Sequence, residues 1–113
     1  MRAGRLRHRI ELQADTATTD DADSFGEVEP SWETYAEVYA DVRPLVGTER
    51  YAAQQVQASV SHEIRIRFRA DVLDTHRVRW VCRGTARLFD INAVLNVEER
   101  DRELLLLCTE ATA

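Results

Sequence analysis

An acidic stretch near the N-terminus has some of the residue types and spacing of a calcium-binding loop. Asp21 and Asp23 alternate and are followed by Gly26, as in loops whose carboxylates wrap oxygen ligands around the ion. However, Phe25 occupies the third ligand position, and Trp32 stands where a bidentate Glu is needed. We therefore expect a solvated acidic loop here, without a bound metal ion.

The histidines and cysteines are the other candidate metal ligands. His8 and His62 fall on the apolar faces of expected strands, and His76 is far from both in the sequence. Cys82 and Cys108 have no CxxC spacing, whereas zinc usually takes four close ligands of these types. We expect no metal site, and we expect both cysteines to be small core residues in a reducing cytoplasm.

No group of residues has the pattern of a catalytic site. No Ser or Cys stands in a glycine-framed elbow, and neither GxGxxG nor a phosphate-binding loop occurs. The carboxylates of residues 98–103 alternate with Arg100 and Arg102, which is typical of a soluble hairpin tip. The sequence therefore predicts a protein that is not an enzyme and that binds no cofactor.

The distribution of charge is the strongest chemical signal. All fifteen basic residues are Arg, and residues 11–41 hold ten carboxylates and no basic residue. A stripe of Arg could follow nucleic-acid phosphates, but the net charge is −5, and the Arg-bearing face has no interleaved aromatic residues. Arg is also enriched in protein interfaces. Our hypothesis is a contact between subunits, in which an Arg face meets the acidic region of the next copy; the residues concerned are Arg65, Arg67, Arg69, Arg77 and Arg79 on one side and Asp20, Asp21, Asp23 and Glu27 on the other.

The first half of the chain predicts two strands, an exposed loop and a short helix. Alternation of apolar and polar residues predicts strands over 5–14, with Gln13 outward, and over 32–42, with Thr34 inward and Tyr35 outward. Residues 15–31 between them are rich in Asp, Thr and Ser, which favours a long exposed loop.

A second loop follows Pro44, which cannot donate to a sheet. Over 44–55 we expect about two helical turns that begin after Gly47, with Thr48 as the cap and Glu49 at the positive helix start.

The second half of the chain predicts four more strands. The clearest alternation covers 56–69, and similar patterns follow over 77–83 and 86–95. The apolar run ELLLLCTE has the length of a strand. We expect the strands over 56–69 and 77–83 to form an antiparallel hairpin, so that the Arg residues named above share its outer face.

Length and composition limit the architecture. The 113 residues are enough for one hydrophobic core, so we treat 1–113 as a single domain. No apolar run is long enough for a membrane span or a signal peptide. The expected fold is mainly β, a small antiparallel β-barrel or sandwich of about six strands with one short helix.

The order of motifs along the chain resembles that of a known family. The motifs are AGRLRHRIELQ (3–13), FGEVEPSWETYAEVYADVRPLVGTERYAAQQ (25–55), HEIRIRFRADV (62–72), ARLFDINAV (86–94) and LLLLCTEA (104–111). They are similar to the phage head-tail joining family, also described as head closure, stopper or connector proteins. The segment 14–29 is longer and more acidic than that family's pattern.

The resemblance implies a virion protein that forms a homo-oligomeric ring at the head-tail interface. The ring, a dodecamer in this reading, would lie in the virion neck below the portal and its adaptor ring protein. It would close or extend the channel for double-stranded DNA and bind a tail terminator or tail-side connector protein. The loop carrying Gly47, Thr48, Glu49 and Arg50 resembles the family's channel-side or adaptor-side element.

Two questions stay open at the level of sequence. The particle could belong to a phage, a prophage or a gene transfer agent, with assembly in the cytoplasm of a bacterial host. The alternative function is a stand-alone nucleic-acid-binding barrel that uses the Arg-rich hairpin.

Overall fold

A computed structural model describes residues 7–17, 26, 28–55 and 59–111, and for residues 49, 50, 52 and 53 it describes only the backbone. The elements are β1 (His8–Asp15), β2 (Trp32–Pro44), α1 (Gly47–Gln54), β3 (His62–Arg67), β4 (Arg77–Cys82), β5 (Thr85–Asn96), the 3-10 turn η3 (Val97–Glu99) and β6 (Glu103–Ala111). The fold is therefore mainly β, as the alternation predicts.

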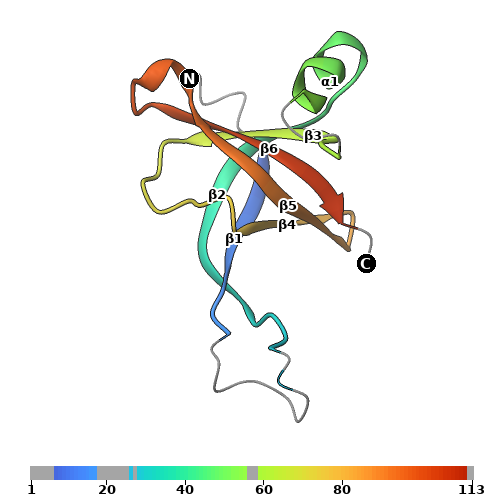
Figure 1. Ribbon diagram of the computed structural model, residues 1–113. Coiled ribbons are helices and arrows are strands. Elements are labelled where there is room, and N and C mark those ends of the chain that lie inside the picture. The colour runs from blue at the N-terminus through green and yellow to red at the C-terminus, as the bar shows by residue number, and fades with distance from the viewer. Residues whose placement is uncertain (1–6, 18–25, 27, 56–58, 112–113) are drawn as a thin grey trace.

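The six strands form one closed antiparallel barrel in the order β1-β2-β3-β6-β5-β4 (Figure 1). β1 closes the circle because it pairs with β2 on one side and with β4 on the other. Closure removes the free strand edges through which sheets otherwise associate. Contacts with other proteins must therefore use the outer faces of the barrel or its projecting segments.

The inward side chains of the alternating strands fill the barrel. The largest fully buried side chains include Phe89, Ile10, Leu12, Ile64 and Leu106. Each is an inward member of its strand because successive side chains point to opposite faces. In the described part of the chain, no helix has the length and apolar character to cross a bilayer.

A β-bulge changes the alternation where β1 and β2 run toward their shared loop. The register shifts between Leu12 and Gln13, so that Tyr35 is the extra residue on β2. Beyond this point Tyr35 packs against the core and Thr34 is exposed. The prediction of Thr34 inward and Tyr35 outward is wrong, because periodicity cannot anticipate an inserted residue.

The predicted hairpin between the third and fourth strands does not form. β3 pairs with β2 and β6, whereas β4 pairs with β5 and β1. The connection from Phe68 to His76 crosses an end of the barrel and buries Val72 there. Neighbouring strands in sequence often pair but need not do so, and alternation specifies the face of a residue without naming its partner strand.

The apolar run of β6 is explained by burial on both of its faces. Leu104, Leu106 and Cys108 point into the barrel, whereas Leu107 belongs to a second, smaller cluster with Leu45 and Val60. Leu45 and Val60 flank α1 in the sequence, so this outer cluster fixes the base of the α1 loop. A strand covered on both faces has a continuous apolar sequence.

Candidate protein-interaction site

The loop between β1 and β2 is fixed at its base by hydrogen bonds. Asp15 Oδ1 accepts hydrogen bonds from the backbone N–H groups of Ala17 and Ser31, both at 2.9 Å. These two bonds hold the pKa of Asp15 below its usual value. Thr16 N–H also donates to the carbonyl of Ser31 at 2.8 Å. The described residues at the root of this loop therefore have a defined course, toward the bottom of Figure 1.

A buried amide connects this root to β4. Gln13 donates to Thr34 Oγ1 at 3.0 Å and accepts from Arg77 Nε at 2.6 Å. The Arg77 guanidinium lies 4.5 Å from the centre of the Trp32 ring, within cation–π range. Gln13 is 7% exposed, whereas its alternation predicts an outward, solvated side chain. The reason is that it lies between Thr34 and Arg77 and binds both side chains.

The outer face of β2, β1 and β4 carries ordered ion pairs, and we call it the β1 face. Glu11 and Glu37 lie opposite each other across β1 and β2, and each is paired with an Arg. Glu37 binds Arg9, and Glu11 binds Arg79. A shallow hollow is lined by Arg9, Glu11, Glu37 and Val81. The exposed side chain of Val81 borders these charges.

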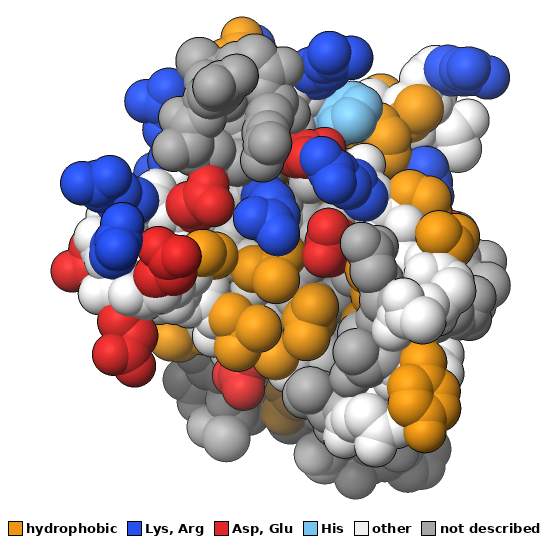
Figure 2. All heavy atoms as spheres, turned by 90° about the horizontal axis from the view of Figure 1, so that it is seen from above, with side chains coloured by type: hydrophobic (Ala, Val, Ile, Leu, Met, Phe, Trp, Pro, Cys, Tyr) orange, Lys and Arg blue, Asp and Glu red, His pale blue; other side chains and the backbone are white. Residues whose placement is uncertain are grey.

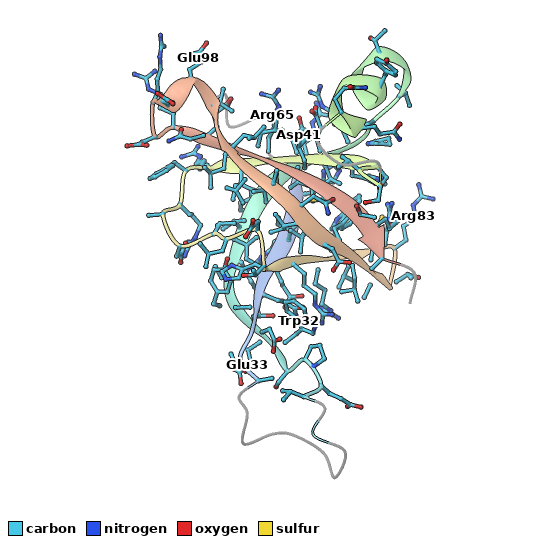
Figure 3. All side chains as sticks on the ribbon, in the orientation of Figure 1. Trp32, Glu33, Asp41, Arg65, Arg83 and Glu98 are labelled. Carbon is cyan, nitrogen blue, oxygen red and sulfur yellow. The ribbon has the colours of Figure 1, made fainter. Side chains whose placement is uncertain are left out.

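The opposite side of the barrel presents a different surface, which we call the β6 face. One register row crosses four strands, through Asp41 on β2, Arg65 on β3, Leu105 on β6 and Leu95 on β5. Arg65 and Asp41 lie side by side near the top of Figure 3. Figure 2 views the molecule from above and shows hydrophobic side chains between Arg and acidic side chains.

The charges of the β6 face are incompletely satisfied within the described chain. Arg65 Nη1 lies 3.5 Å from Glu103 Oε1. Asp41 Oδ2 is buried and accepts no hydrogen bond there, although Arg43 Nε lies 3.0 Å away. The Arg43 guanidinium therefore compensates the charge of Asp41, whereas Arg67 on the same face has no carboxylate partner among the described residues.

The α1 loop is anchored to β6 by hydrogen bonds as well as by the outer cluster. Leu45 N–H donates to the Ser61 carbonyl and Ser61 N–H donates to the Cys108 carbonyl, both at 2.9 Å. Thr109 Oγ1 donates to the Ser59 carbonyl at 3.0 Å. On the loop itself, Tyr51 is 71% exposed. Thus α1 has a fixed base and an uncovered surface.

One end of the barrel brings several polar side chains together. The His8 and Trp80 rings pack with their centres 4.7 Å apart, and Arg87 Nε lies 2.6 Å from Glu110 Oε2. The Arg87 guanidinium holds the pKa of Glu110 below its usual value, which keeps this carboxyl ionised. We assign these contacts a role in stabilising the fold, because the charges of Arg87 and Glu110 are paired with each other.

The other end of the barrel holds a Tyr–His pair. Tyr35 Oη lies 2.8 Å from His76 Nδ1, which also accepts from Leu73 N–H at 3.3 Å. Burial raises the pKa of Tyr35 to about 12, so the hydroxyl stays protonated and donates to His76. Among the described residues, no group of three or more His, Cys, Asp or Glu side chains could hold a metal ion.

The structure separates the arginines predicted to share one face. Arg65 lies on β3 at the β6 face, whereas Arg77 and Arg79 lie on β4 at the β1 face. Arg69 follows β3 and pairs with Asp71 at 2.8 Å. Of this predicted set, Arg67 and Arg77 have no carboxylate partner among the described residues, and Arg77 binds the Gln13 amide instead. The common Arg face is wrong, because it depended on the hairpin that does not form.

The remaining predicted site residues are only partly placed. Asp20, Asp21, Asp23 and Glu27 lie outside the described residues. Gly47 begins α1 with a positive φ of 58°, a conformation that glycine adopts without strain. Thr48 is exposed, and the side chains of Glu49 and Arg50 lie outside the described part.

Sequence reasoning missed the residues that make the two faces distinctive. Asp41 and the Leu95–Leu105 pair become neighbours only through the β2-β3-β6-β5 order. The one available signal was the unbroken apolar run of β6, which indicates that both faces of that strand carry apolar contacts.

The fold and these surfaces define a small closed β-barrel with projections at both ends, a module built for contacts with other proteins. The sequence model of the family described as phage head completion protein matches residues 1–111, and the chain belongs to that family. It is a structural virion protein that acts at head completion.

Two solved structures resemble the chain over nearly its whole length. Protein SF1141 from Shigella flexneri 2a, a solution structure, shares 30% identity with a TM-score of 0.76, covering 99% of this chain and 98% of that one. A chain from the virion of a native gene transfer agent particle shares 21% identity with a TM-score of 0.58, covering 96% and 98% respectively, and this likeness concerns the fold. Comparison with the curated proteins found no match.

Proposed function

We propose that this protein is one subunit of a ring in the neck of the virion, below the portal and its adaptor ring. The ring closes or extends the DNA channel and receives the tail. The observation that carries this proposal is the closed barrel, whose two anchored projections leave from opposite ends of β2. Such a subunit can contact one protein above it and another below while its rigid body packs beside its neighbours.

The family resemblance supports the partners of this ring. We propose twelve copies, an adaptor ring on the head side and a tail terminator or connector on the tail side. Double-stranded DNA passes through the channel, and the net charge of −5 favours sliding over binding because like charges repel. The protein has a structural role without catalysis.

The proposed nucleic-acid-binding alternative loses its main support in this fold. Arg77 and Arg79 are separated from Arg65 and Arg67, and most of this set contacts groups of its own chain. A phosphate-binding groove would need these guanidinium groups free and on one surface.

The two loops have different proposed roles. The α1 loop contacts the adaptor ring or lines the channel, because its base is fixed and Tyr51 and Val46 are exposed. The acidic loop over 15–31 reaches a neighbouring subunit or a tail-side protein. The charge-complementary contact of Asp20, Asp21, Asp23 and Glu27 with a neighbour's arginines stays a proposal, with Arg67 as the available guanidinium.

Replacing residues 46–54 with a short Gly-Ser linker tests the proposed function. Leu45 and Val60 are kept, so the outer cluster persists, and the barrel should retain its circular dichroism and melting temperature. Particles carrying this variant should have filled heads that leak DNA or lack tails, as counted by negative-stain microscopy. Leu73→Ser, at an exposed site outside α1, is the matched control. Normal numbers of infectious particles with the linker variant would refute the proposal.

A further inference from the structure

The central strands of the two faces, β1 and β6, lie on opposite sides of the barrel, and β2 borders both faces. In the closed order β1-β2-β3-β6-β5-β4, three steps separate β1 from β6 in either direction. A head-to-tail ring requires two different surfaces of this kind on each subunit, one for each neighbour. The described strands leave no free edge for strand pairing, so the bodies of two neighbouring barrels would meet through their outer faces.

Both faces have exposed apolar side chains. On the β6 face, Leu95 is 45% exposed beside Leu105. On the β1 face, Val81 is 49% and Tyr39 is 59% exposed. Apolar and aromatic side chains surrounded by charged groups are typical of the centre and rim of a protein interface.

The charges on the two faces are complementary. The β6 face has an exposed guanidinium without a carboxylate partner among the described residues, that of Arg67. The β1 face has an exposed carboxylate, that of Glu37, which pairs with Arg9; the two side chains are 48% and 65% exposed respectively. An exposed pair of this type is weakly held and can exchange partners at low cost.

We propose that the β6 face of one copy docks on the β1 face of the next copy in the ring. This inference rests on the proposed function. Leu95 packs against Val81 and Tyr39 of the neighbour. Arg67 binds the neighbour's Glu37. The partner is a second copy of this chain, because both complementary halves occur on one molecule.

Cysteine pairs test this contact in particles produced with the variant protein. The background is Cys82→Ser, since the half-buried Cys82 is adjacent to position 81. Val81→Cys with Leu95→Cys in one chain should give a ladder of disulfide-linked oligomers on a non-reducing gel. Either substitution alone should give none, and Val81→Cys with Leu73→Cys, an exposed site on the connection after β3, is the matched control.

The outcomes separate this inference from the proposed function. If the chain is absent from particles, both fail. If it is present in particles and no ladder forms, or if Leu95→Cys alone gives dimers, only the face-to-face contact is overturned.

A charge exchange gives a second, independent readout. Arg67→Glu or Glu37→Arg alone should lower the amount of protein retained in particles about tenfold, since like charges then face each other across the contact. The double variant should restore most of it. Melting temperatures of the purified variants show whether the barrel is intact, and failure of the double variant to restore retention would overturn the pairing.

Discussion

Asp15 illustrates how one side chain can determine where a projection starts. Its carboxylate accepts two backbone hydrogen bonds across the root of the β1–β2 loop. Trp32 and Arg77 stack beside this root, and Gln13 lies beneath Arg77. The loop is therefore oriented by polar contacts outside the apolar core.

The root of the loop should loosen in acid. The pKa of Asp15 is lowered in the folded protein, so its contribution is complete above the ordinary carboxyl value near ~4 and is lost as the pH falls through the lower folded value. Amide exchange at Ala17 and Ser31 should accelerate over that range while the barrel core stays protected. Asp15→Asn keeps an acceptor oxygen without titrating, so an equal acid response in this variant would contradict the assignment.

At the scale of elements, the β4–β5 turn holds a non-glycine residue, Arg83, in a backbone conformation that arginine rarely adopts. Cys82 pairs with Thr85, and the two residues between them, Arg83 and Gly84, have φ values of 53° and 82°. Two positive φ values define a type I′ turn, which favours Asn-Gly. Arg83 extends outward from this tip in Figure 3.

Arg83→Asn should stabilise the barrel by about 1 kcal/mol, because asparagine tolerates the left-handed conformation better than arginine. Urea unfolding followed by circular dichroism measures the change. Arg100→Asn is the matched control, since Arg100 is exposed and has a φ of −96°. A loss of stability in Arg83→Asn would show that the Arg83 side chain makes a contact that outweighs the backbone strain.

At the scale of the whole molecule, closure of the barrel isolates its interior. Cys108 is fully buried, and burial raises the pKa of its thiol well above the usual value. Cys82 is half-buried near the open end of β4. The prediction that both cysteines are core residues is therefore confirmed for Cys108 and is wrong for Cys82.

Thiol labelling should report the opening of the barrel. Cys82 should react with a small aromatic disulfide in the native protein, whereas Cys108 should react only as fast as the barrel opens. Low concentrations of urea should accelerate the slow phase alone. In Cys82→Ser the fast phase should vanish; labelling of Cys108 at the rate of an exposed thiol would mean that the barrel is not closed in solution.

The sequence by itself predicted six strands and the face of most residues, but the strand predicted over 56–69 is too long, because β3 covers only His62–Arg67. Alternation with a period of two identified Ile10, Leu12, Ile64 and Ile66 as inward, and these residues are buried in the barrel. Gly47 and the residues after it predicted a helix of two turns, which α1 confirms. These features are local, because they depend on the backbone geometry of single segments.

Only the tertiary structure decided which strands pair and therefore which charges meet. Arg65 and Arg79 have the same alternation in sequence, yet one faces Glu103 and the other binds Glu11 on the opposite side of the barrel. The bulge at Tyr35 likewise depends on how β2 fits β1. Alternation with a period of two determines whether a side chain points into or out of the barrel. Its neighbours depend on the order in which the strands pair when the sheet closes.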